Sequence, residues 1–320
     1  GEIAIRIAQA AAELGMRSVA VHPADDAASL HVRRADEACL LPGRGAAAYL
    51  DIDAVVQAAK DTGCDAVHPG YGFLSENARF ARRCAEAGLV FVGPDPAALD
   101  LFGDKTSARQ CALDNDVPLM EGTQGPASCA QVSAFLAAQG TGAAVVIKAV
   151  AGGGGRGMRI VHAPGEVEEA YARCSSEALA AFGNGALYAE RLMERARHVE
   201  VQIIGDGTGA VSHLHERDCT LQRRHQKLVE LSPSPGLLPA TRERLFAAAL
   251  RMAAAVRYRG LGTFEFLVDA DAGERFAFIE VNPRLQVEHT VTEAVLGVDL
   301  VQAQLAIAGD DASLDVQRSR

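Results

Sequence analysis

The chain has 320 residues, of which 49% are hydrophobic and 22% charged, a composition typical of globular proteins and a length that suits about two domains. Lys and Arg total 31 against 41 Asp and Glu, and the net charge of −10 argues against general binding to nucleic acids or membrane surfaces. No apolar run approaches the roughly 18 residues of a membrane span, and the amphipathic opening GEIAIRIAQAAAELG does not resemble a signal peptide. Seven cysteines without a C-x-x-C pair favour free thiols in a reducing cytoplasm.

Helices and short strands alternate over the first hundred residues. Expected helices, each followed by an expected strand, cover 2–14 and 17–22, 51–63 and 64–70, and 76–89 and 90–94. This alternation predicts an α/β domain with a wound parallel sheet, whose ligand crevice lies at the carboxyl ends of the strands. No strand precedes the first helix, so we expect the sequence to be clipped at its start.

From about Gly103 the pattern changes to α+β with antiparallel strand pairs. Helices are expected at 104–115, shortly before residue 143, at 165–182 and at 240–258. Strands are expected at 143–150, 158–162, 186–193, 198–206, 209–218, 262–268 and 275–282.

The segment KAVAGGGGRGMRIV, residues 148–161, contains a formal G-x-G-x-x-G match through Gly152, Gly154 and Gly157. A dinucleotide-binding loop would be followed by a helix, whereas these glycines are followed by another β-branched run, and no Walker motif occurs here. The glycines therefore cap a hairpin. A flexible glycine flap beside Lys148 suits a triphosphate, because main-chain N–H groups can close on phosphate oxygens. The alternative is a turn without a ligand, which four consecutive glycines disfavour by their entropic cost.

Two glutamates in the last expected hairpin share one face of it. Glu265 and Glu280 are symmetric about the turn 269–273, so they are expected directly opposite each other, with Asn282 on the same face. The opposite, apolar face is expected to carry Phe264, Phe266, Ile279 and Val281. Two carboxylates and an amide oxygen suit Mg²⁺ or Mn²⁺ bridging nucleotide phosphates, not zinc. The alternative is a solvated polar face at a sheet edge.

Two further segments concentrate polar residues. Arg284, Gln286 and Glu288 continue the period of two from Glu280, so an extended chain would present them in one row, with an arginine to orient a small oxyanion beside a carboxylate base. The segment ERDCTLQRRHQKLVE adds a positive patch of Arg223, Arg224, His225 and Lys227. This patch is either an anion-binding loop or a solvated loop, and the lack of interleaved aromatics argues against nucleic acid.

With these motifs together, the chain resembles the biotin carboxylase subunits and domains of biotin-dependent carboxylases, which are ATP-grasp enzymes. The resemblance covers essentially the whole chain and rests, in family order, on GEIAIRI, HPGYGFLSENARFA, GDKTSA, IKAVAGGGGRGM, RHVEVQI, ERDCTLQRRHQK, GTFEF and EVNPRLQVEHTVTE. It implies a Rossmann-like N-terminal domain over 1–102, an ATP-grasp domain over 103–310 with a glycine-flap subdomain at about 120–190, and the start of a missing C-terminal domain over 311–320. On this basis we expect the sequence to be a fragment of a larger carboxylase.

The resemblance also assigns roles to single positions. Nucleotide-binding positions are Lys105, Lys148, Gly154, Gly155, Glu190, Arg191, Leu192, Met193, His198 and His225. The divalent-metal positions, which agree with the hairpin analysis, are Glu265, Glu280 and Asn282. The bicarbonate positions are Lys227, Arg284, Gln286 and the main chain of Val287. Catalytic positions are Arg284, Glu288 as the base that deprotonates bicarbonate, and Lys227.

The implied enzyme is an ATP-dependent ligase with Mg²⁺ or Mn²⁺. Bicarbonate attacks the γ-phosphoryl group of ATP, and the resulting carboxyphosphate carboxylates biotin on a carrier domain, with a carboxyltransferase as further partner. Neither a nucleic acid nor a membrane is expected as partner, a homo-oligomer is compatible with the family, and the location is the cytoplasm, or the mitochondrial matrix in a eukaryote.

Some positions depart from the family pattern. Ala151 stands where some members have a further glycine, and Arg191 where lysine is common; both changes are conservative in this context. The run Asn282-Pro283-Arg284 resembles pyruvate carboxylases and fused acyl-CoA carboxylases more than free bacterial subunits. Two alternatives stay open: a nucleotide-binding module without full turnover, and another ATP-grasp ligase that joins a carboxylate to an amine.

Overall fold

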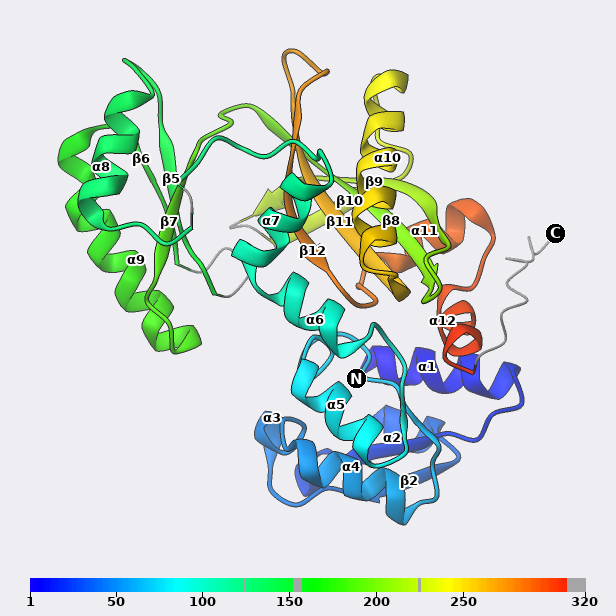
Figure 1. Cartoon of the computed structure of the whole chain (residues 1–320). Coiled ribbons are helices and arrows are strands. Elements are labelled where there is room, and N and C mark those ends of the chain that lie inside the picture. Colours follow the sequence, from blue (N-terminus) through cyan, green and yellow to red (C-terminus); the bar gives the residue numbers. More distant parts are fainter. Residues whose placement is uncertain (124, 152–156, 224–225, 310–320) are drawn as a thin grey trace.

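The computed structural model describes residues 1–123, 125–151, 157–223 and 226–309. They form three lobes (Figure 1): an N-terminal lobe coloured blue to cyan, a small lobe coloured green, and a lobe built on a five-stranded sheet, coloured yellow-green to orange. The predicted combination of a wound α/β region and an α+β region is confirmed.

The N-terminal lobe contains the expected alternation of helices and parallel strands. Its strands form two parallel pairs, β1 (Val19–His22) with β2 (Glu37–Leu40) and β3 (Ala66–Val67) with β4 (Val90–Phe91). Strand β2 was not expected from the sequence. The helices are α1 (Glu2–Glu13), α2 (Leu30–Arg34), α3 (Gly45–Ala48), α4 (Ile52–Asp61), α5 (Ala78–Glu86) and α6 (Pro96–Gly103), and a short 3₁₀ turn at Ala24–Asp26 lies between β1 and α2.

The small lobe is an antiparallel sheet in the order β6-β5-β7, covered by two helices. Its strands are β5 (Val145–Ala149), β6 (Met158–Val161) and β7 (Leu187–Arg191), and its helices are α8 (Cys129–Ala138) and α9 (Val167–Phe182), the latter preceded by a 3₁₀ turn at Pro164–Glu166. Ser128 and Gln131 form a capping box at the start of α8, and Gly183 ends α9 in the left-handed conformation. Because β5 pairs antiparallel with β6, the two strands that flank the glycines form a hairpin, as predicted.

The third lobe is an antiparallel sheet in the order β10-β9-β8-β11-β12. Its strands are β8 (Ala196–Asp206), β9 (Val211–Arg223), β10 (Gln226–Leu231), β11 (Arg259–Asp269) and β12 (Phe276–Asn282). The helices α10 (Pro239–Ala255) and α7 (Lys105–Asp114) pack on one face and bury its apolar side chains. Of the basic segment interpreted as a loop, the described residues 216–223 and 226–230 instead belong to β9 and β10, which pair antiparallel, so their alternating side chains face opposite sides of the sheet.

The hairpin of β11 and β12 confirms the predicted pairing of Glu265 with Glu280 and corrects one detail. The register shifts after Glu265, so Phe266 pairs with Phe278 and Ile279 is the extra residue of a bulge. Ile279 is therefore half-buried, and Phe278 occupies the core position that was expected for Ile279.

The predicted row of polar side chains from Glu280 to Glu288 is wrong beyond Asn282. Strand β12 ends there, the chain turns, and Glu288 is the residue before α11 (His289–Leu296). A last helix, α12 (Leu300–Ala308), follows. In the part of the chain that the structure describes, no single helix is long and apolar enough to cross a membrane; only α11 and α12 taken together reach that length and composition, with a bend of 102°.

Polar contacts and one short segment connect the lobes. Arg6 on α1 forms ion pairs with Glu293 (3.1 Å) and Asp299 (2.7 Å), and these tie the N-terminal lobe to α11 and α12. Residues 119–122 join the two sheets, because Leu119 pairs with Phe278 of β12 and Gly122 pairs with Glu190 of β7. This bridging segment sets the small lobe beside the five-stranded sheet.

Candidate functional site

Lys227 lies at the centre of a cluster of buried carboxylates. Its Nζ atom is 2.5 Å from Oε2 of Glu200 on β8, 2.9 Å from Oε1 of Glu265 on β11 and 2.7 Å from Oε1 of Glu288 before α11. Burial alone would lower the pKa of the Lys227 ammonium, but the three carboxylates outweigh burial and raise it. Lys227 is therefore a permanent cation that holds three separate elements together.

Glu265 and Glu280 face each other across β11 and β12, but their surroundings differ. Glu265 lies 2.8 Å from His198 Nε2 and accepts a hydrogen bond from the Asn282 amide (2.9 Å). Burial opposes ionisation of Glu265, yet His198 and Lys227 lower the pKa of its carboxyl. Burial and the nearby Glu265 raise the pKa of the Glu280 carboxyl. An additional cation between the two carboxylates would relieve this repulsion.

Arg284 connects this site to the N-terminal lobe. Its Nε atom forms an ion pair with Glu76, which lies just before α5, and its Nη2 atom donates a 3.1 Å hydrogen bond to the Asn282 side-chain oxygen. Gln286 is buried, and its side-chain oxygen has no hydrogen-bond partner among the described residues. Val287 is 61% exposed, so this residue lies at the surface of the protein.

A second charged group lies where the small lobe meets α7. The buried carboxylate of Glu190 on β7 forms ion pairs with Lys148 on β5 and with Arg109 on α7. Lys105, the first residue of α7, is half-buried; burial lowers the pKa of its ammonium, and the charge of Glu280 opposes this shift. Lys105 is therefore close enough to interact with Glu280 of the five-stranded sheet and with Lys148 and Glu190 of the small lobe.

Of the positions after Glu190, Arg191 is the last residue of β7, and Leu192 and Met193 follow the strand. Arg191 is half-exposed, with its guanidinium 3.8 Å from Glu121. The Arg191 N–H donates to Glu121 O and the Leu192 N–H donates to Ala144 O, both at 2.8 Å, and Met193 follows directly. Three predicted positions, Gly154, Gly155 and His225, lie outside the described residues.

The sequence interpretation missed four charged residues of the site: Glu76, Arg109, Glu200 and Arg217. Glu200 is fully buried and accepts a 2.5 Å hydrogen bond from the fully buried Arg217, which also contacts Thr292 of α11 (2.7 Å). A signal for Glu200 was present, because Glu200 and Gln202 alternate with Val199 and Val201 along one strand. No local pattern distinguishes Arg109, whose partner Glu190 is distant in sequence.

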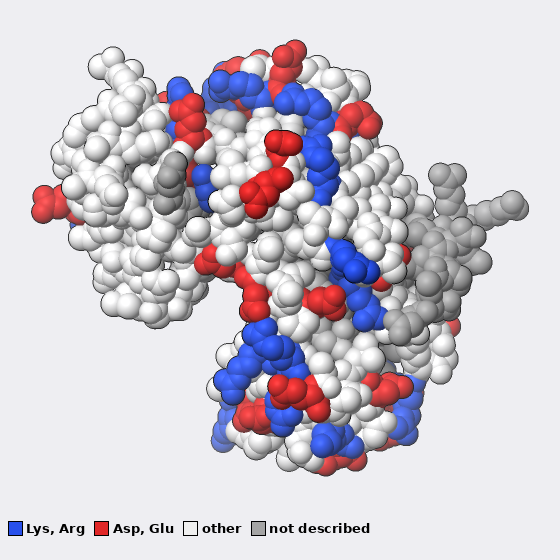
Figure 2. All heavy atoms as spheres, viewed as in Figure 1, with Lys and Arg blue, Asp and Glu red and all other residues white. Residues whose placement is uncertain are grey.

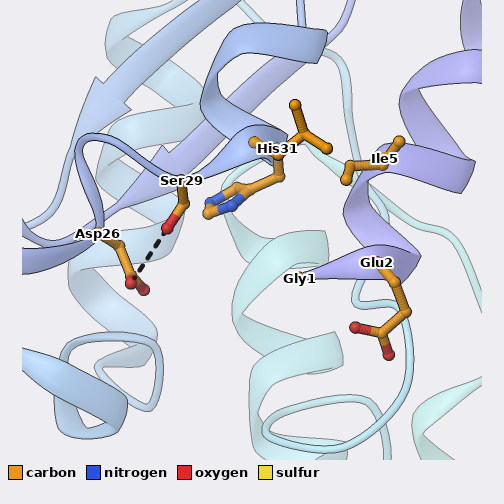
Figure 3. A pocket seen from close by; sticks show the side chains of 7 residues that line it. Gly1, Glu2, Ile5, Asp26, Ser29 and His31 are labelled. Atoms are coloured by element: carbon orange, nitrogen blue, oxygen red, sulfur yellow. Dashed lines mark hydrogen bonds between the residues drawn. The ribbon is translucent and has the colours of Figure 1, made fainter.

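Other groups on the molecule are less suited to chemistry. Cys219 lies beside Glu200 and Glu288, but burial raises the pKa of its thiol, so it stays protonated. A surface pocket between α1 and α2 contains none of the predicted site residues (Figure 3). Figure 2 shows acidic and basic side chains interspersed over one face of the molecule, without a broad basic surface.

Comparisons with known proteins agree with this geometry. Residues 1–99 match the family model "Biotin carboxylase, N-terminal domain", and residues 104–315 match "Carbamoyl-phosphate synthase L chain, ATP binding domain". The pyruvate carboxylase of Bacillus subtilis is 53% identical over 312 residues, covering 96% of the chain and 27% of the relative. Human mitochondrial pyruvate carboxylase is 51% identical, with coverages of 96% and 26%. The chain thus spans about a quarter of the length of these relatives.

Solved structures show the same similarity. A biotin carboxylase from Campylobacter jejuni, described as a β,γ-ATP complex, superposes with a TM-score of 0.92 at 42% identity, covering 96% of the chain and 69% of that protein. The biotin carboxylase domain dimer of Hydrogenobacter thermophilus 2-oxoglutarate carboxylase, described with MgADP, ADP and bicarbonate, gives a TM-score of 0.92 at 40% identity, with coverages of 97% and 68%.

Proposed function

The chain belongs to the biotin carboxylase family, and from this membership we propose that it carries out the ATP- and bicarbonate-dependent carboxylation of biotin. One observation carries the proposal: Lys227 pairs with Glu288 and Glu265 at the same time. A cation and a base suited to a small oxyanion therefore lie next to the opposed Glu265 and Glu280, which suit a metal-bound triphosphate.

We assign the nucleotide to the space between the two sheets. Lys105 and Lys148 supply positive charge for the phosphates, and the main chain from Glu190 to Met193 serves as the hinge at the adenine edge. His198, which contacts Glu265, lies on the same side of the sheet as the metal carboxylates. Gly154, Gly155 and His225 remain assignments from the family resemblance alone.

Glu265, Glu280 and Asn282 fit a hard divalent cation such as Mg²⁺ or Mn²⁺. The fit rests on the two opposed carboxylates; burial and the charge of Glu265 raise the pKa of the Glu280 carboxyl, and a cation between the two would favour its ionised form. When bound, the cation would neutralise phosphate charge.

Lys227, Arg284, Gln286 and the Val287 N–H are the proposed bicarbonate ligands. Glu288 accepts the bicarbonate proton, and a bicarbonate oxygen bonds to the γ-phosphorus as the bond from that phosphorus to the β–γ bridging oxygen breaks, which gives ADP and carboxyphosphate. The carboxyl carbon of this intermediate then bonds to a ureido nitrogen of biotin as its bond to the phosphate oxygen breaks, and the released phosphate takes up the proton that this nitrogen loses. The residues act by positioning and charge, without a covalent intermediate on the protein.

The complete reaction involves more than this chain. We propose that biotin arrives on a carrier domain and that a carboxyltransferase passes the carboxyl group to pyruvate or to an acyl-CoA. The relatives include bacterial and mitochondrial carboxylases and a domain dimer, so we propose the cytoplasm or the mitochondrial matrix as location, and a homo-oligomer as assembly.

Release of ADP by the intact protein tests the proposal. We expect ATP cleavage that requires bicarbonate and is stimulated by free biotin. Cleavage that ignores bicarbonate would contradict the assignment and favour a different ATP-grasp ligase. A second measurement, the affinity of the 320-residue chain for Mg-ATP, separates nucleotide binding from turnover.

A further inference from the structure

We propose that Arg109 is a positioning residue for nucleotide binding: it keeps the buried Glu190 carboxylate paired, so that Lys148 is free to move from Glu190 to the phosphates. The inference rests on the proposed function, since it takes Lys148 as a phosphate ligand. It concerns a residue on α7 that the sequence motifs did not single out.

A single carboxylate is shared by two cations. Glu190 is 4% exposed; its Oε1 atom pairs with Nη1 of Arg109 and its Oε2 atom pairs with Nζ of Lys148. The two cations thus occupy different oxygens, and either one can leave without displacing the other. The formal charges of one arginine, one lysine and one glutamate sum to +1.

The two cations differ in how firmly they are held. The Arg109 guanidinium lies 5.6 Å from the centre of the Tyr188 ring and donates to the Met120 carbonyl (3.4 Å). Beside Met120, Gly122 allows the main chain to approach β7 closely, because a Cβ atom there would lie 2.7 Å from the Ala189 carbonyl oxygen. Arg109 is therefore fixed from several sides.

Lys148 is held differently. It projects from β5 on the same sheet face as Tyr188, and its ammonium is a compact charge on a flexible stem that can change partner. Of the two cations beside Glu190, Arg109 is therefore suited to stay paired with the carboxylate, and Lys148 is suited to move to another partner.

The consequence for a bound triphosphate follows from charge. If Lys148 turns to a phosphate, Glu190 keeps Arg109 as its counter-ion. Without Arg109 the same movement would leave a buried carboxylate unpaired, which is strongly unfavourable. Lys148 would then stay on Glu190, and nucleotide binding would weaken although no phosphate ligand had been removed.

The test measures the Mg-ATP affinity of the 320-residue chain by calorimetry. Arg109→Met is expected to weaken binding by about tenfold or more, because the uncharged thioether leaves Glu190 with Lys148 alone. Arg109→Lys is expected to keep most of the affinity, and Arg173→Met, which removes an exposed arginine of α9, serves as matched control.

The double variant Arg109→Met with Glu190→Gln separates positioning from a general structural role. An uncharged amide needs no counter-ion, so this variant is expected to recover most of the lost affinity. Unchanged binding by Arg109→Met overturns the inference, as does a folded double variant that binds no better than the single one. If the unaltered chain binds no Mg-ATP, the proposed function fails, and this inference fails with it.

Discussion

Nζ of Lys227 lies 2.7 Å from Oε1 of Glu288, so the proposed base is held beside a permanent cation. Burial of Glu288 would raise the pKa of its carboxyl, but the charge and hydrogen bond of Lys227 outweigh burial and lower it. Glu288 is therefore ionised at neutral pH and ready to accept a proton.

Replacing Lys227 should change the pH dependence of turnover. Glu288 acts as a base only when it is ionised, so its lowered pKa extends activity to lower pH. Lys227→Gln removes the neighbouring cation, so the pKa of Glu288 should rise. The acid limb of the pH–rate profile should then move to higher pH. The measurement is the pH profile of bicarbonate-dependent ADP release by the intact protein, with the exposed Lys60→Gln as control. An acid limb that stays in place, whatever the rate at its plateau, would contradict the pairing.

Replacing Glu280 should weaken divalent-cation binding. Glu280→Gln keeps the size of the side chain and removes one of two opposed charges, so Mn²⁺ affinity should fall by about tenfold or more. Electron paramagnetic resonance of Mn²⁺ in the presence of ADP measures it. Glu274→Gln, at the exposed turn of the same hairpin, is the matched control. Equal Mn²⁺ affinity in both variants would mean that the metal does not bind at Glu280 of β12.

Replacing Arg217 should destabilise the fold. Arg217 is fully buried and bonds to Glu200, Gln202, Thr263 and Thr292. Arg217→Met leaves buried polar groups without this donor, and we expect a loss of about 3–5 kcal/mol in the free energy of unfolding. Urea denaturation measures it, and adding Glu200→Gln should restore part of the loss. A change below about 1 kcal/mol would mean that Lys227 alone neutralises Glu200.

Replacing Arg284 should separate turnover from nucleotide binding. Arg284→Ala removes the proposed bicarbonate ligand, so bicarbonate-dependent ADP release should fall by about a hundredfold or more, while Mg-ATP affinity should change little. Glu76→Gln removes the ion-pair partner of Arg284 and should mainly raise the KM for bicarbonate, because the guanidinium loses its orientation. Equal loss of ATP binding and turnover in Arg284→Ala would make Arg284 structural.

Local patterns in the sequence predicted the elements of the fold well. The symmetric spacing of Glu265 and Glu280 about a turn was sufficient to predict their pairing, because a hairpin obeys a simple register. The bulge at Ile279 was not predictable in this way, since one extra residue leaves the alternation of the sequence almost unchanged. Beyond Asn282, polar residues at every second position suggested that the strand continues, although the chain turns there toward α11.

The charged partners were harder to predict than the strands. Glu76 meets Arg284 across 208 positions of sequence, and Glu190 meets Arg109 across 81. No periodicity connects residues so far apart; their meeting depends on how the lobes assemble. The family resemblance suggested roles for single positions, but it did not indicate the ion pairs between these side chains.

The bridging segment 119–122 has a mechanical consequence. One end is fastened to β12, which carries Glu280, and the other to β7, which carries Glu190. Any tilt of the small lobe must be absorbed by the few main-chain torsions between Leu119 and Gly122. This short span therefore limits how far the sheet that carries Lys148 can move from the sheet that carries Glu280.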